Sequence, residues 1–145
     1  METIIKKRLE RLVLFSSEEQ QSSAWYDKRH NMITASEISA ILDVNPFITK
    51  HQLLINKCSE MKDESNEYTI WGNIFEDVAK DIYKQLFLVD EIYETGCVTH
   101  SNYNFLGASP DGILTNGKLI EIKCPKNRKI SSKKIPYSYW IQMQI

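Results

Sequence analysis

The sequence predicts an α/β (α+β) fold whose N-terminal half is rich in helices and whose C-terminal half contains a mixed β-sheet flanked by helices. Two patterns lead to this expectation. Apolar residues recur at helical spacing up to about residue 88, and shorter strand-like segments bounded by turn residues follow. The chain of 145 residues, 42% of them hydrophobic, is long enough to bury one core. We therefore expect a single globular domain.

The first two predicted helices carry local signals. Met1–Phe15 is basic and amphipathic, with apolar residues at helical spacing, so we expect a packing helix rather than a membrane or targeting element. Thr34-Ala35-Ser36-Glu37 has the pattern of a capping box, in which Thr34 and Glu37 cap each other's backbone. The helix that it begins is expected to end at Asn45-Pro46-Phe47.

Two further helices are predicted before the strands. Residues 49–61 form an amphipathic segment, with Leu53, Leu54 and Cys58 expected to face inward. A long helix is predicted over Glu67–Leu88, because apolar residues recur there with a period near four. Glu76 lies off that apolar stripe, and a solvated glutamate is the usual outcome at such a position.

Strands are predicted over Glu91–His100 and Asn104–Ser109, followed by a hairpin and a final helix over Pro136–Ile145. The hairpin joins residues 112–115 to residues 118–124 through Asn116-Gly117, a pair typical of the type I′ turn. In its second strand, Glu121 and Lys123 are two residues apart and are expected to share one face.

This grouping of charges is typical of a metal site. Asp111 and Glu121 would supply carboxylate oxygens and the Ile122 carbonyl a third oxygen, which are the ligands that Mg²⁺ or Mn²⁺ prefers. Lys123 could orient or deprotonate a nucleophile, or neutralise a phosphate. The alternative is a surface hairpin with solvated charges. The apolar residues Leu119, Ile120 and Ile122 favour the first interpretation, because they predict a largely buried strand.

Charge and cysteine content narrow the function classes. The net charge of −1 argues against a uniformly basic nucleic-acid binder, yet residues 123–134 contain six Lys or Arg and no acid, whereas residues 60–94 are acid-rich. This basic stripe suits a polyanion, and its alternative is a solvated loop. Three widely spaced cysteines predict neither a disulfide framework nor a zinc site. We expect an intracellular protein of a reducing compartment, host cytoplasm or nucleus if viral, that is not secreted.

Five segments together resemble the lambda-type phage exonuclease, or YqaJ-type viral recombinase, family of PD-(D/E)XK restriction-endonuclease-like nucleases. They are residues 29–37 (RHNMITASE), 71–76 (WGNIFE), 109–112 (SPDG), 121–125 (EIKCP) and 139–144 (YWIQMQ). Each motif alone is weak, and their order makes the resemblance specific. It implies a restriction-endonuclease-like core in a domain over residues 25–145, after an N-terminal helix or extension over residues 1–24. The family fold continues past the last motif, so we expect this domain to be incomplete at its C-terminus.

The resemblance implies a Mg²⁺-dependent deoxyribonuclease, with Mn²⁺ as a substitute, that digests duplex DNA from the 5′ end in viral recombination or DNA end processing. A structure-specific endonuclease of the same fold and a non-catalytic DNA-binding or assembly remnant remain alternatives. Double-stranded DNA is the expected partner, and the resemblance allows for a single-strand annealing protein and a homo-oligomeric ring trimer. No membrane is implied.

Site residues follow from the matched positions. The resemblance assigns Asp111 and Glu121 to metal ligation, Lys123 to the catalytic lysine, Glu76 to an accessory metal-site carboxylate, and Gln142 to orienting the metal site or water. Residues of a 5′-phosphate pocket are also implied, and these are Arg29, Ser36, Ser109 and either Arg128 or Lys129. Arg29 suits a terminal phosphate through its bidentate fork, and Ser36 lies in the first turn of a capped helix.

Overall fold

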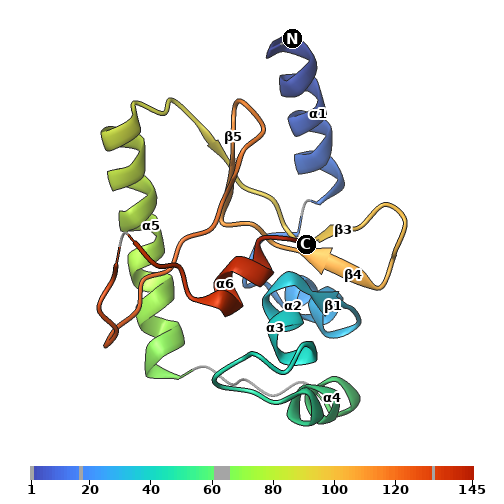
Figure 1. The fold of residues 1–145 in the computed structure, drawn as a ribbon. Coiled ribbons are helices and arrows are strands. Elements are labelled where there is room, and N and C mark those ends of the chain that lie inside the picture. Colours follow the sequence, from blue (N-terminus) through green and yellow to red (C-terminus); the bar gives the residue numbers. More distant parts are fainter. Residues whose placement is uncertain (1, 17, 61–65, 132) are drawn as a thin grey trace.

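The computed structural model describes residues 2–16, 18–60, 66–131 and 133–145. It confirms the α/β (α+β) class, with helices first in the chain and strands later (Figure 1). The elements, in order, are α1 (Glu2–Phe15), α2 (Ser23–His30), β1 (Ile33–Thr34), the 3₁₀ turn η1 (Ala35–Glu37), α3 (Ile38–Ile41), α4 (Lys50–Cys58), α5 (Glu67–Phe87), β2 (Ile92–Tyr93), β3 (Val98–Thr99), β4 (Leu106–Ala108), β5 (Gly112–Leu114), β6 (Leu119–Ile120) and α6 (Tyr137–Gln142).

The strands form two small sheets that share the β4–β5 connection. The first has the order β1-β4-β3 and is mixed, because β1 is parallel to β4 and β3 is antiparallel to it. The second has the order β2-β5-β6 and is antiparallel throughout. The turn between β4 and β5 therefore joins the two sheets, and it carries Asp111.

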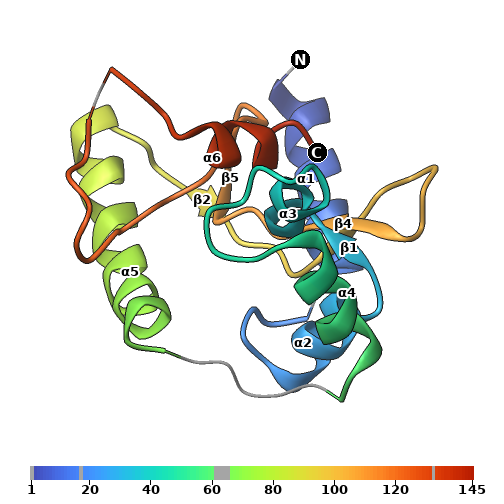
Figure 2. The ribbon, with the colours of Figure 1, turned by 60° about the horizontal axis from the view of Figure 1, so that its bottom comes forward.

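The long helix α5 confirms the prediction over residues 67–88. Asn66 caps its start by accepting hydrogen bonds from Tyr68 N and Thr69 N, and Leu88 ends it in a left-handed conformation with φ 51°. Both ribbon views place α5 at one edge of the molecule (Figures 1 and 2). Its apolar stripe is largely exposed, with Ile74 62% and Leu86 71% accessible. Helical periodicity therefore predicted the helix correctly without showing whether its apolar face is covered.

The prediction of a single strand over residues 91–100 is wrong. The structure divides it into β2 and β3, which belong to different sheets. The chain turns at Gly96, whose N–H donates to the Ser16 carbonyl at 2.8 Å. A Cβ at Gly96 would lie 2.4 Å from the Glu18 carbonyl oxygen, so this close approach requires glycine.

The hairpin is confirmed, but its turn type and second strand differ from prediction. A type I′ turn requires positive φ at both Asn116 and Gly117. Among the residues described, Gly117 has a positive φ of 83°, whereas Asn116 does not have a positive φ. The Gly117 N–H donates to the Leu114 carbonyl at 2.8 Å, and Leu114 N–H donates to the Lys118 carbonyl at 2.8 Å. A three-residue loop with a left-handed glycine therefore connects the strands. The second strand, β6, ends at Ile120, so Glu121 lies in the segment that follows it.

Two local expectations are also corrected. The capping box is present, with the Glu37 carboxylate accepting from Thr34 N at 2.9 Å, but the helix that follows ends at Ile41. In α4, which packs against α3, Leu53 is the buried residue, whereas Leu54 and Cys58 are exposed.

The final helix, α6, begins after Pro136 as its N-cap residue and is shorter than predicted. The helix α2 was not predicted; it begins at a Ser22 cap that accepts from Trp25 N at 3.2 Å. Among the residues that the structure describes, no helix is long and apolar enough to cross a membrane.

Candidate active site

Asp111 is fixed where the chain passes from β4 to β5. The side-chain amide of Gln20 donates a hydrogen bond to the Pro110 carbonyl at 3.0 Å, which anchors the turn to the segment before α2. Gly112 packs so closely on β2 that an added Cβ would lie 2.3 Å from Cγ2 of Ile92. The backbone around Asp111 thus has little room to move.

Five residues predicted for the site are brought together here. The Asp111 carboxylate accepts a hydrogen bond from Ile122 N at 2.5 Å, which joins the start of β5 to the segment after β6. The Glu121 carboxylate forms an ion pair with Lys123 and accepts from the Gln142 side-chain amide at 2.6 Å. Because Gln142 lies on α6, which packs against α3 and η1, the helix orients Glu121 from outside the hairpin.

The surroundings of Asp111 disfavour its charge. Burial, and next the charge of Glu121, raise the pKa of Asp111 from 3.8 to about 6. Glu76 contributes in the same direction, while the Ile122 N–H and the Lys123 ammonium oppose the increase. The negative charge of Asp111 is therefore compensated only in part by its protein neighbours.

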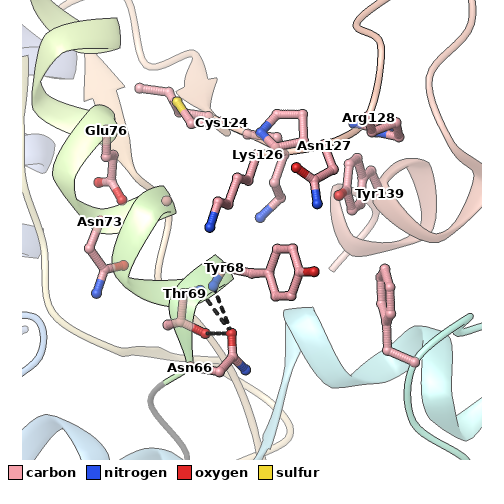
Figure 3. A pocket seen from close by; sticks show the side chains of 15 residues that line it. Asn66, Tyr68, Thr69, Asn73, Glu76, Cys124, Lys126, Asn127, Arg128 and Tyr139 are labelled. Atoms are coloured by element: carbon pink, nitrogen blue, oxygen red, sulfur yellow. Dashed lines mark hydrogen bonds between the residues drawn. The ribbon is translucent and has the colours of Figure 1, made fainter.

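Glu76 faces this cluster from α5. Its side chain is half-buried and points into the cleft between α5 and the Ile122–Arg128 segment (Figure 3). Lys80 forms ion pairs with Glu76 at 2.9 Å and with Glu94 at 2.8 Å. Burial acts to lower the pKa of Lys80, but the hydrogen bonds to Glu94 and Glu76 outweigh it and raise that pKa. The charged ammonium thus holds Glu76 in position.

The donor set suits a hard divalent cation. Asp111 and Glu121 offer carboxylate oxygens, and the Ile122 main-chain carbonyl lies next to Glu121 in the chain. Within the described residues, no three His, Cys, Asp or Glu side chains form a compact metal-binding group. One or two carboxylates completed by water and substrate oxygens is the usual arrangement for Mg²⁺. The partly compensated charge at Asp111 fits the same ion.

A second cluster joins Arg29, Ser36 and Ser109. The Arg29 guanidinium donates to Ser109 Oγ at 3.2 Å and to Ser36 Oγ at 3.0 Å, and it stacks 4.3 Å from the centre of the Trp25 ring. The Trp25 indole N–H also donates to Ser109 Oγ, at 3.1 Å. Burial lowers the pKa of Arg29, so this charge is poorly hydrated and an anion would be a favourable partner.

Arg128 or Lys129 was expected to complete this cluster. The Arg128 guanidinium lies 5.1 Å from the centre of the Tyr139 ring and lines the cleft beside α5. Lys129 is exposed. The contacts thus associate Arg128 with α6, and the assignment of either residue to the cluster around Arg29 remains an expectation.

Several residues that hold the site were not singled out from the sequence. Gln20 anchors the turn before Asp111, Trp25 positions Arg29, and Lys57 donates to the carbonyls of Arg29 and Met32 at 2.7 and 2.8 Å. Each bond joins residues at least 25 positions apart. The one local signal was that Trp25 lies one helical turn before Arg29, where an aromatic ring can stack on a guanidinium.

The comparison with known protein families decides the identity of this arrangement. The YqaJ-like viral recombinase domain matches residues 24–145, which contain Arg29, Asp111, Glu121 and Gln142. The chain belongs to this family. The matched residues contain the side chains of both clusters, so the YqaJ-like domain builds the site. The fold of this domain is restriction-endonuclease-like, as in the similar exonuclease structures described next.

Relatives and solved structures agree with this membership. A protein of African swine fever virus is 31% identical over an alignment 160 residues long, and this alignment covers 88% of this chain and 45% of that protein. A protein of Acanthamoeba polyphaga mimivirus is 31% identical over 144 residues, covering 87% of this chain and 26% of the relative. The crystal structure of an alkaline exonuclease from Laribacter hongkongensis has a TM-score of 0.70 at 26% identity, covering 85% of this chain and 66% of that one. A complex of the same exonuclease with dAMP has a TM-score of 0.69 at 27% identity and the same coverage.

The YqaJ-like chain therefore spans less than half the length of these viral relatives and about two thirds of the exonuclease.

Proposed function

We propose that this YqaJ-like protein is a metal-dependent exonuclease that hydrolyses duplex DNA from the 5′ end, in viral recombination or DNA end processing. The observation that carries the proposal is the closeness of the two clusters. Ser109 belongs to the Arg29 cluster, and Asp111 follows two residues later, so their Cα atoms are at most about 7 Å apart. Successive phosphates of one strand lie about 3.4 Å apart along the duplex axis. A terminal phosphate at Arg29 would therefore leave the next phosphodiester near Asp111 and Glu121.

Each residue has a role in this proposal. Asp111, Glu121 and the Ile122 carbonyl would hold Mg²⁺, or Mn²⁺ in its place, with Glu76 as an accessory carboxylate. When bound, the cation lowers the pKa of water and stabilises charge on the scissile phosphate. Gln142 orients Glu121 through its 2.6 Å hydrogen bond.

Lys123 and the pocket residues act on the substrate. The Lys123 ammonium lies beside Glu121, where it can neutralise charge on the phosphate or orient the attacking water. Arg29, with Ser36 and Ser109, binds the terminal 5′-phosphate by charge-assisted hydrogen bonds. The complex of the Laribacter exonuclease with dAMP supports the proposal, because a nucleoside monophosphate is what an exonuclease releases.

The test is digestion of linear and covalently closed duplex DNA with Mg²⁺ and with EDTA. We expect Mg²⁺-dependent release of mononucleotides from the linear DNA and an intact circle. Asp111→Asn and Glu121→Gln are each expected to lower the rate by roughly 100-fold or more, since loss of a group that only holds a metal ligand in place already costs about 10–100-fold. Asp90→Asn, which changes an exposed aspartate outside the site, is the matched control.

Each contrary result has a defined meaning. Nicking of the closed circle would favour a structure-specific endonuclease of the same fold. DNA binding without hydrolysis in any divalent metal would favour a non-catalytic DNA-binding module.

A further inference from the structure

A large cleft extends from the candidate active site along α5. Its volume is about 960 Å³, and it lies between the N-terminal half of α5, the Ile122–Arg128 segment and α6. Glu76 and Lys123 line it near the carboxylates, and Tyr68 and Phe47 line it further away. The proposed roles of Asp111, Glu121 and Arg29 leave most of this space unassigned.

Aromatic rings and cations lie close together around the cleft. Tyr68 projects from α5 and Tyr139 from α6, as Figure 3 shows. The Lys126 ammonium lies 5.8 Å from the centre of the Tyr68 ring, and the Arg128 and Lys123 charges lie 5.1 and 5.4 Å from the centre of the Tyr139 ring. Each ring is thus accompanied by a positive group that a phosphate could approach.

Two aromatic side chains of the cleft are exposed to solvent. Tyr68 is 54% accessible and Phe47 89% accessible, although both are large and apolar enough to favour a core. Lys126 is held above Tyr68 by its ion pair with Glu67 at 2.6 Å. The lining described by the structure contains three basic side chains, Lys123, Lys126 and Arg128, and one carboxylate, Glu76.

Exposed rings beside cations match the chemistry of an unpaired nucleic-acid strand. Every base has a π-face that stacks on an aromatic ring, and the backbone supplies the phosphates, whereas a duplex has its base faces already stacked. We propose that the cleft binds unpaired nucleotides of the DNA strand, with a base stacked on Tyr68 and neighbouring phosphates at Lys126 and Arg128. The proposal rests on the proposed function, since it places this strand next to the hydrolytic site.

The distance between the base-binding residue Tyr68 and the carboxylates follows from the geometry of α5. Tyr68 and Glu76 are eight residues apart on α5, which corresponds to about 12 Å along the axis. A stacked nucleotide rises about 3.4 Å and an unpaired strand can be more extended, so this distance spans at most about three to four nucleotides. The base on Tyr68 therefore belongs to the part of the strand that has not yet reached the carboxylates.

Strand binding without hydrolysis tests the proposal. A fluorescein-labelled oligothymidylate with a 5′-hydroxyl end is titrated with protein in EDTA at fixed low salt, and anisotropy gives the Kd. Tyr68→Ala is expected to weaken binding roughly 5- to 140-fold, the loss found for one base–aromatic stack. Tyr68→Phe keeps the ring and is expected to bind like the wild type. Tyr103→Ala, which removes a tyrosine of nearly equal exposure (53%) outside the cleft, is the matched control.

An abasic oligonucleotide of the same length separates stacking from charge. We expect the wild type to bind it more weakly than oligothymidylate, and Tyr68→Ala to have little further effect on it. Lys126→Gln is expected to weaken both ligands. Equal Kd values for wild type and Tyr68→Ala on oligothymidylate, or an equal loss on the abasic strand, would overturn the inference. Its failure is distinguishable from failure of the proposed function, because this titration requires no metal and no cleavage.

Discussion

At the residue scale, Asp111 combines burial with the like charge of Glu121. Both raise its pKa, to about 6 from an ordinary value of 3.8. Between these two pH values the folded protein holds a proton that the unfolded chain has lost. Unfolding then releases this proton, so stability falls as pH rises through the window.

Asp111→Asn is therefore expected to stabilise the metal-free protein at neutral pH. The amide oxygen can still accept from Ile122 N, while the unfavourable charge is gone. The expected gain in unfolding free energy in EDTA at pH 7.5 is about 1–3 kcal/mol, shrinking to little below pH 4. Denaturant unfolding of both proteins at the two pH values measures it, with Asp90→Asn as control. A variant less stable than wild type at pH 7.5 would mean that Asp111 stabilises the fold.

Some residues of the site could be predicted from the sequence, and others could not. Asp111, Glu121 and Lys123 are close in the chain, and a hairpin pattern was sufficient to place them together. Trp25 could not be placed, because its hydrogen bond to Ser109 spans 84 residues. Local patterns thus predicted that these charged groups lie together, and the contacts that support them required the folded structure.

At the scale of elements, local signals predicted helices and turns better than strands. The range of α5, the capping box at η1 and the place of the hairpin loop depend on neighbouring residues, and the structure confirms where they lie. The segment over residues 91–100 depends instead on the close approach of Gly96 to Glu18, a contact across 78 positions. For the same reason the exposure of the apolar stripe on α5 could not be predicted, because periodicity shows which face is apolar and not what covers it.

Two glycines give opposite predictions for these elements. Gly96→Ala is expected to destabilise the fold by roughly 1–3 kcal/mol, because its Cβ would meet the Glu18 backbone. Gly72→Ala is expected to stabilise it by about 0.5–1 kcal/mol, because nothing lies within 4 Å of its Cβ and alanine is the better helix former. Thermal and urea unfolding of the two variants measure these changes. Similar effects from both would argue against the close packing described at Gly96.

At the scale of the whole molecule, charge is distributed unevenly around an overall net charge of −1. Basic residues 123–134 follow the carboxylate site and supply Lys126 and Arg128 to the cleft, while Arg29 contacts Ser109, two residues before Asp111. A strand could thus run from the cleft, past the carboxylates, to the Arg29 cluster. This order is what an enzyme that works from a strand end requires.

The most direct measurement is the rate of digestion of linear duplex DNA with 5′-phosphate or 5′-hydroxyl ends, at one salt concentration. The extra charge of a terminal phosphate strengthens charge-assisted hydrogen bonds by about 1–3 kcal/mol, so we expect the phosphorylated end to be digested roughly 5- to 140-fold faster. Arg29→Lys, which loses the fork that spans Ser36 and Ser109, is expected to reduce this preference more than it slows digestion of 5′-hydroxyl ends. Equal rates on the two ends with the wild-type protein would contradict the 5′-exonuclease account.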